Sequence, residues 1–260
     1  MLKTIIVCII AGLGAGLGTG FAGLSAAVFI SPMLVAFLDY PVYQAVGIAL
    51  ASDVLASAIS SYNYGKAGNI DIKRGKTLFA TVLLFTIIGS LIAFFITSNP
   101  LGNNAMGYIS ILTALFLGIT FMIPKKEKEK REFLAAGRMK RVVIACGIYV
   151  GLVCGLQGAG GGMMLLIVMT GIMQFEFKPA IGTSVFIMTF TALIGAITHF
   201  VTGGMPDTLL LVLCVISTAV FAQIASKIAN VIDNQKLRRV TGIVLVVSGV
   251  IMFVEKILNF

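Results

Sequence analysis

The sequence predicts an all-α protein that crosses a membrane many times and consists of two inverted repeats. Three observations support this fold class: a strongly apolar composition, apolar blocks of membrane-spanning length, and a match between the two halves. Of the 260 residues, 58% are hydrophobic and 11% are charged, whereas a soluble domain has about 25% charged residues. A soluble domain of any size is therefore excluded, and the lipid bilayer is the expected environment.

Eight hydrophobic blocks reach the length of about 20 apolar residues that a membrane helix needs. They cover residues 4–38, 42–63, 74–97, 104–123, 141–174, 178–201, 207–226 and 237–257. These blocks define an N-terminal membrane repeat (1–123), a basic cytoplasmic linker (124–140) and a C-terminal membrane repeat (141–260). We expect a multi-pass protein of the cell membrane, which in a bacterium is the inner membrane.

An internal repeat appears when the second half of the chain is laid over the first, because glycines then fall into register without gaps. In this register, called the repeat alignment below, the matched pairs include Gly16 with Gly151, Gly20 with Gly155, Gly23 with Gly158, Gly47 with Gly182, and Gly68 with Gly203. Matched apolar residues mean little in a membrane protein, but glycines in register are informative. Internal repeats of this kind are common among transporters.

The loop charges predict that the two halves are inverted. Loop 65–76 carries four basic residues and its partner 200–211 carries none, whereas loop 98–104 is uncharged and its partner 227–239 carries four. Basic residues mark cytoplasmic loops, so equivalent loops of the two halves should lie on opposite sides of the membrane. Inverted halves need an odd number of crossings each.

The first block of each half is too long for one straight span. Blocks 4–38 and 141–174 would each extend about 51 Å as single helices, whereas the hydrocarbon core is about 30 Å thick. Both blocks are interrupted by glycine, so we expect two short helices that meet at the glycines. They form either two crossings, which gives up to ten helical segments, or one crossing with a re-entrant hairpin.

The charge, cysteine and motif content excludes several function classes. The net charge of +9 lies in short loops, where it sets topology rather than binding nucleic acid. The four cysteines are scattered without a C-x-x-C pair, and no cluster of metal-ligating residues occurs. One histidine and one acid inside a span do not form a catalytic constellation. We expect no enzyme, catalytic residue, metal or cofactor, and a homo-oligomer remains open.

The glycine cluster at 158–162 is the first candidate for the working site. Glycine breaks a helix and frees backbone N–H groups, which in hydrocarbon are tolerated where they line a cavity. Helix N-termini and open backbone bind anions without a fixed cation. The candidate substrate-binding residues of the second half are Gln157, Gly158, Gly160, Gly161, Gly162, Thr183 and Ser184. The other interpretation is that these glycines only allow close helix packing.

The counterpart in the first half reads Gly23-Leu24-Ser25-Ala26-Ala27 and offers Gly23 and Ser25 as binding residues. Alanines at the last two positions leave the backbone less open than glycines do. We therefore expect an asymmetric site, in which the second half does more of the binding.

These residues together resemble the sulfite exporter TauE/SafE family, also called the toluene-sulfonate uptake permease family. The resemblance covers nearly the whole chain and includes the G-x-G-G-G pattern at 158–162, the stretch 180–184 and the Gly68-Asn69-Ile70-Asp71 loop. Family members carry a proline five residues after the glycines; here the first half keeps Pro32 and the second has Ile167. The resemblance implies a secondary transporter, a permease or exporter, for small sulfur-containing anions such as sulfite or organosulfonates.

Two titratable residues inside predicted spans are candidates for proton coupling. Asp53 is the only acid well inside a span, and an intramembrane carboxyl is by default a functional hypothesis; it aligns with Met188. His199 is the only histidine, and its tunable protonation suits a proton relay. Both could instead be structural hydrogen-bonding residues. The alternative function is a proton- or cation-coupled transporter of another small solute that uses Asp53.

Overall fold

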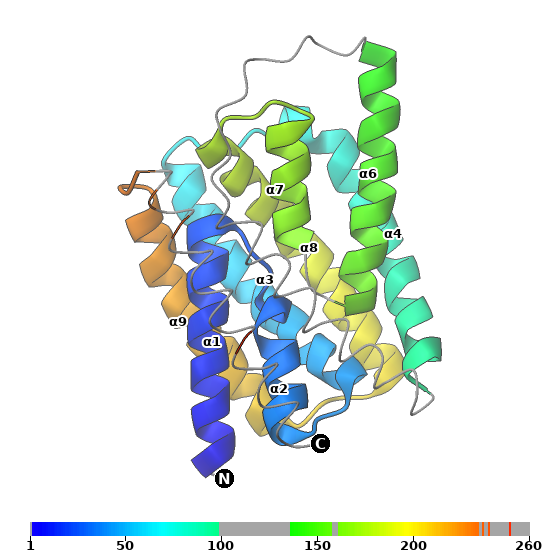
Figure 1. The fold of residues 1–260 in the computed structure, drawn as a ribbon, viewed down its shortest axis with the longest axis vertical. Helices are drawn as coiled ribbons and strands as arrows, with labels where there is room; N and C mark the ends of the chain where they lie inside the picture. Colours follow the sequence, from blue (N-terminus) through cyan, green and yellow to red (C-terminus); the bar gives the residue numbers. More distant parts are fainter. Residues whose placement is uncertain are drawn as a thin grey trace.

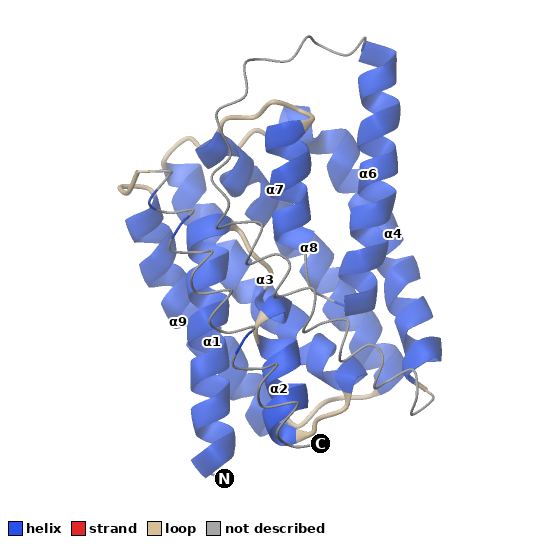
Figure 2. Ribbon diagram, viewed as in Figure 1, coloured by secondary structure: helices blue, strands red, loops and turns tan. Residues whose placement is uncertain are grey.

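The computed structural model describes residues 2–98, 136–157 and 161–233, together with residues 236, 239 and 250. All regular structure in these residues is helical, as Figure 2 shows. Six of the described helices are long and apolar enough to cross a membrane. The prediction of an all-α polytopic membrane protein is therefore confirmed. The predicted block 104–123, and most of block 237–257 and of the linker, lie outside the described residues.

Each long first block forms one helix of spanning length followed by a short one. In the first half these are α1 (Leu2–Ala22) and α2 (Ile30–Leu38), joined through the 3-10 turn η1 (Ala26–Val28). In the second half they are α6 (Ala136–Gln157) and α7 (Gly161–Gly171). At 1.5 Å per residue, α2 and α7 are only about 14 and 17 Å long. Of the two arrangements expected for these blocks, two full crossings are therefore excluded, because each second helix is too short.

Both blocks are hairpins that return to the end of the bundle from which they started (Figure 1). The end of α2 lies at the α8–α9 connection, where the Asp207 backbone N–H donates to the Tyr40 hydroxyl over 2.9 Å. The end of α7 lies near the start of α4, where the Arg74 guanidinium donates to the Met173 carbonyl over 2.7 Å. In Figure 1, α1 rises from the bottom and α6 descends from the top. The two hairpins therefore enter the bundle from opposite ends.

Four further spanning helices surround the hairpins: α3 (Val42–Lys66), α4 (Ile72–Thr97), α8 (Phe177–Gly203) and α9 (Thr208–Ala229). The most extensive helix contacts join α1 with α9, α4 with α6, and α3 with α8. The repeat alignment carries α1 onto α6, α4 onto α9 and α3 onto α8. The α1–α9 pair is therefore repeated as the α6–α4 pair, and the α3–α8 pair maps onto itself with the roles of the halves exchanged. Inverted repeats require such contacts; the inversion itself and the identity of the cytoplasmic face stay predictions.

Glycines at every fourth position explain the closeness of the α1–α9 and α4–α6 pairs. A Cβ atom placed on Gly16 of α1 would lie 2.8 Å from the backbone nitrogen of Ala222. A Cβ atom on Gly151 of α6 would lie 2.7 Å from the Val82 carbonyl oxygen. Membrane helices associate through such small residues, because lipid offers no hydrophobic drive to bring helices together. For these register glycines, the packing interpretation holds.

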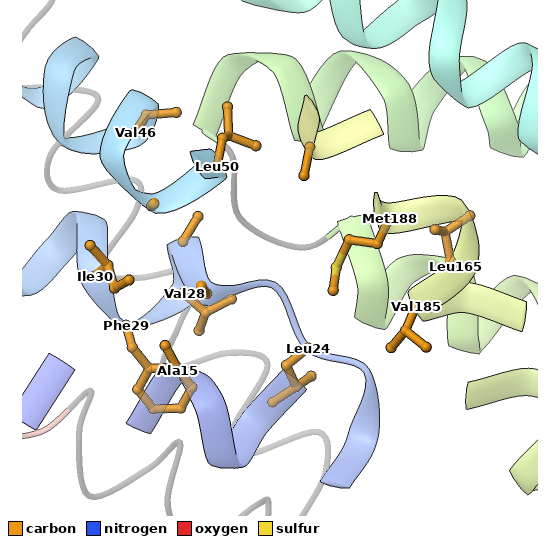
Figure 3. Close-up of a cluster of buried hydrophobic side chains, with 14 of the residues drawn as sticks. Ala15, Leu24, Val28, Phe29, Ile30, Val46, Leu50, Leu165, Val185 and Met188 are labelled. Carbon is orange, nitrogen blue, oxygen red and sulfur yellow. The ribbon is translucent and has the colours of Figure 1, made fainter. Parts of the chain in front are cut away.

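The core lies between α3, α7, α8 and the first hairpin turn. Leu24 and Phe29 of the first turn belong to the same cluster of buried side chains as Val185 and Met188 of α8, and Figure 3 draws part of this cluster. The outer faces of α4 and α9 instead expose large apolar side chains: Leu84, Leu91 and Phe95 on α4, and Val212, Ile216 and Val220 on α9. The four-residue spacing on α9 forms an apolar stripe for lipid. The first hairpin turn and the start of α7 are thus held inside the protein, away from lipid.

Candidate functional site

The candidate site is the place where the turn of the first hairpin meets the start of α7 in the second. The first turn follows α1 at Gly23, whose φ of +63° is a conformation that residues with a side chain rarely adopt. The second turn leads into α7, and Gly162 packs directly on the Gly23 carbonyl oxygen, where no side chain would fit. A Cβ atom on Gly23 would also lie 2.8 Å from the Ser184 Oγ. The structure therefore brings Gly23, Gly162 and Ser184 together, although they lie far apart in the sequence.

The first turn binds a carboxylate of the protein itself. Asp53 on α3 is fully buried, and its Oδ2 accepts a 2.5 Å hydrogen bond from the Ser25 hydroxyl. Its Oδ1 accepts a 2.6 Å hydrogen bond from the Ala26 backbone N–H. The Ser25 hydroxyl accepts in turn from the Ala27 N–H over 3.2 Å. Ser25 and Asp53, which the sequence analysis assigns to separate roles, therefore form one cluster.

This cluster holds a carboxylate with neutral donors alone. No ion pair within the described residues involves Asp53, so the Ser25 hydroxyl and the backbone N–H groups of η1 take the place of a cation. Hydrogen bonds to a charged group are roughly twice as strong as neutral ones. Below the carboxyl, the Ser57 hydroxyl donates to the Asp53 carbonyl over 2.5 Å and accepts from the Thr189 hydroxyl over 3.0 Å. The turn of a hairpin in this fold can therefore bind an oxyanion in a buried place.

The second half has a different residue at the position that corresponds to Asp53. The repeat alignment places Asp53 on Met188, Ala26 on Gly161 and Ala27 on Gly162. The Met188 sulfur lies 2.9 Å from the position that a Cβ atom on Gly162 would take. Met188 thus reaches the start of α7 as Asp53 reaches the first turn, but it brings no charge and no strong acceptor.

The remaining predicted binding residues divide into two groups. Gly158 and Gly160 lie outside the described residues, and Gln157 is the last residue of α6. Ser184 lies at the junction of the turns, where its hydroxyl donates to the Ile181 carbonyl. Thr183 points elsewhere, since its hydroxyl accepts a 2.9 Å hydrogen bond from the Asp71 backbone N–H. The geometry groups Ser184, and not Thr183, with the turns.

His199 lies apart from the turns, near the C-terminal end of α8. Its ring stacks on Tyr43 with 4.2 Å between ring centroids and 21° between planes. The Tyr43 hydroxyl lies 2.5 Å from the Thr202 hydroxyl and donates to the Ser90 carbonyl over 3.2 Å. The sequence analysis missed Tyr43, because it lies at the start of a predicted span and gives no local signal of this contact.

Comparison with known proteins agrees with the fold. The family model described as "Sulfite exporter TauE/SafE" matches residues 8–252. The chain is similar to the probable membrane transporter protein YdhB of Bacillus subtilis, 24% identical, with 91% of this chain and 95% of the relative covered. It is also similar to the probable membrane transporter protein MJ0441 of Methanocaldococcus jannaschii, 27% identical, with 74% and 70% covered. No solved structure matches. The chain belongs to the sulfite exporter TauE/SafE family of membrane transporters, and is a multi-pass transporter rather than an enzyme.

Proposed function

We propose that the protein is a secondary transporter of small sulfur-containing anions, such as sulfite or organosulfonates, and that the second hairpin turn binds the substrate. One observation carries this proposal: the first turn holds the Asp53 carboxylate through the Ser25 hydroxyl and the Ala26 N–H. The corresponding residue of the second half is Met188, which leaves the oxyanion position there without an internal acid.

The chemistry of the second turn suits a sulfonate or sulfite group. The first N–H groups of α7, at Gly161 and Gly162, have no partner within the helix, and the helix dipole favours a negative charge there. Glycine allows an oxyanion to approach these groups closely. Ser184 adds a hydroxyl beside the junction. Gln157, Gly158 and Gly160 complete the proposed set as chain neighbours of the turn, and Thr183 is left out of it.

Substrate energetics bear on the direction of transport. A membrane potential of about 100 mV, negative inside, favours export of a monovalent anion by about 2.3 kcal/mol. Export therefore needs no coupling ion, whereas uptake of the same anion needs a cation to offset the potential. Because the two hairpins enter from opposite ends and meet at Gly23 and Gly162, a movement of either hairpin would expose the junction to one face.

A transporter of a cation or another solute, bound by Asp53, is the second candidate. It is less well supported, because both Asp53 oxygens already accept hydrogen bonds and a cation would have to displace the Ser25 and Ala26 donors. Replacement of Asp53 by asparagine separates the two functions. Retained anion binding by the variant supports the first candidate, and loss of all solute binding supports the second.

The proposal is tested by a thermal-shift screen of the purified protein against sulfite, thiosulfate, methanesulfonate, sulfate and acetate. We expect the sulfur oxyanions to raise the unfolding temperature. The Met188→Asp variant should lose this effect, because its own carboxylate would occupy the second turn as Asp53 occupies the first. Met188→Asn is the matched control, because asparagine has nearly the shape of aspartate without its charge. This variant should still be stabilised by the sulfur oxyanions.

Two results would contradict the proposal. One is stabilisation of the wild-type protein by another class of solute and by none of the sulfur oxyanions. This result would refute the proposed substrate class. The other is equal anion binding by Met188→Asp and Met188→Asn. This result would refute the second turn as the substrate-binding site.

A further inference from the structure

His199 is a buried titratable residue that the proposed anion site does not use. It is the only histidine of the chain, its side chain is 2% exposed, and it lies on α8 near the end of the helix. A buried polar group normally has its hydrogen-bonding atoms satisfied. One of the two ring nitrogens of His199 departs from this rule.

The hydrogen bond between His199 and Gly195 indicates which ring nitrogen carries the proton. Nδ1 lies 2.9 Å from the carbonyl oxygen of Gly195, one turn earlier on α8. A carbonyl oxygen only accepts, so Nδ1 must be the nitrogen that bears hydrogen. In the neutral ring, Nε2 then presents a lone pair, and it has no hydrogen-bond partner among the described residues. The ring therefore offers a vacant acceptor inside the bundle.

The groups around the ring are hydroxyls and one aromatic face. From α3, Tyr43 stacks on the ring and is the titratable group in contact with it. From α4, Ser90 reaches the cluster through the bond between its carbonyl and the Tyr43 hydroxyl, and its own hydroxyl has no partner in the described part of the chain. From α8, Thr202 bonds to the same Tyr43 hydroxyl. None of these side chains carries a charge near neutral pH.

The first half has no such vacancy at the corresponding position. The repeat alignment places Tyr64 on His199, and the Tyr64 hydroxyl donates to the Gly20 carbonyl over 3.1 Å. The vacant nitrogen therefore belongs to the second half alone, as does the proposed substrate turn.

We propose that Nε2 of His199 binds the proton that accompanies the anion through this transporter. The inference rests on the proposed function. A proton that enters from the exposed Gly204 end of α8 would add to the vacant Nε2 lone pair, which yields an imidazolium with hydrogen on both nitrogens. Release toward water reverses the step.

The position of Tyr43 favours the charged ring. A cation within about 6 Å of an aromatic ring centroid is attracted to the ring face, and the 4.2 Å stacking places an imidazolium inside that range. Asp53 differs from His199 in this respect, because both of its oxygens already accept hydrogen bonds from the first turn. A proton on His199 and a monovalent anion together carry no net charge, so the membrane potential does not oppose their joint uptake.

The single histidine allows a direct test by nitrogen NMR of protein labelled in the imidazole ring. We expect the neutral ring to carry its hydrogen on Nδ1. At a fixed pH, saturating methanesulfonate, whose charge is constant in this range, should increase the protonated fraction. Two results would overturn the inference. One is a neutral ring that carries its hydrogen on Nε2. The other is a ring that stays neutral in saturating anion at every pH at which the protein is folded. Because this measurement uses the wild-type protein, it does not depend on whether a variant folds.

A transport assay in proteoliposomes supplies the second test. Methanesulfonate uptake by the wild-type protein should be accelerated by an inward proton gradient, and His199→Gln should lose this acceleration while it still binds the anion. Thr198→Val is the control on the same helix and should respond as the wild type does. Among the described residues, the Thr198 hydroxyl bonds only to the Ile194 carbonyl one turn earlier. An unchanged response in His199→Gln refutes proton binding at His199. Absence of methanesulfonate binding in the thermal-shift screen instead refutes the proposed substrate class.

Discussion

The hydrogen bonds from the first hairpin turn to Asp53 predict how much stability the Asp53→Ala variant loses. The substitution removes the acceptor of two hydrogen bonds, from the Ser25 hydroxyl and the Ala26 N–H, and both donors are buried. Hydrogen bonds to a charged group contribute about 1.5–3 kcal/mol each. The free energy of unfolding should therefore fall by about 3–6 kcal/mol, which is a large part of the stability of most proteins.

Two further variants should lose less stability than Asp53→Ala. Asp53→Asn keeps one carbonyl acceptor and should lose about half as much, about 1.5–3 kcal/mol. Ser57→Ala removes a neutral hydrogen bond to the Asp53 carbonyl and should cost about 1 kcal/mol. The order of stability should therefore be wild type, Ser57→Ala, Asp53→Asn and Asp53→Ala, from the most to the least stable.

The assay is reversible unfolding of the detergent-solubilised protein with increasing dodecyl sulfate, followed by loss of helical circular dichroism. The reasoning is refuted if Asp53→Ala unfolds at the same point as Ser57→Ala. Such a result would mean that the two buried donors find other partners at no cost, and the first turn would then be no example of anion binding in this fold.

Two predictions concern the packing and orientation of the halves. Gly155→Ala should destabilise the protein by about 1–3 kcal/mol in the same assay, because its new methyl group would meet the backbone of α4, whereas Gly171→Ala has open space and should have little effect. Epitope tags inserted after Ala67 and after Met205 should be accessible from opposite sides of the membrane in intact and permeabilised cells. Access to both tags from one side would contradict the inverted arrangement.

The sequence predicts the spanning helices well, because their lengths follow from the thickness of the bilayer. Block 42–63 became α3 (Val42–Lys66), and block 178–201 became α8 (Phe177–Gly203). The division of the long first blocks is different. Glycine shows that a helix is interrupted, but it does not show how long each piece is, so the short α2 and α7 could not be told from full crossings.

The contact between Asp53 and Ser25 could not be predicted from local sequence, because it joins residues 28 positions apart across a helix boundary. A physical argument does point toward it. An acid inside a span without a basic partner must find donors, and the broken backbone of its own half supplies unpaired N–H groups. The stacking of Tyr43 on His199 has no such signal, because both residues are compatible with an ordinary apolar helix face.

The asymmetry between Asp53 and Met188 also bears on how an anion would leave the protein. The first turn touches the start of α7 at Gly23 and Gly162, so a substrate anion bound at the start of α7 would lie near the Asp53 carboxylate. Two like charges about 10 Å apart repel by about 1.7 kcal/mol at an effective dielectric constant of 20, enough to weaken binding by more than tenfold. A transporter gains from this, because tight binding would slow release. A proton on His199 would then offset part of the repulsion on entry, and its departure would restore that repulsion for release.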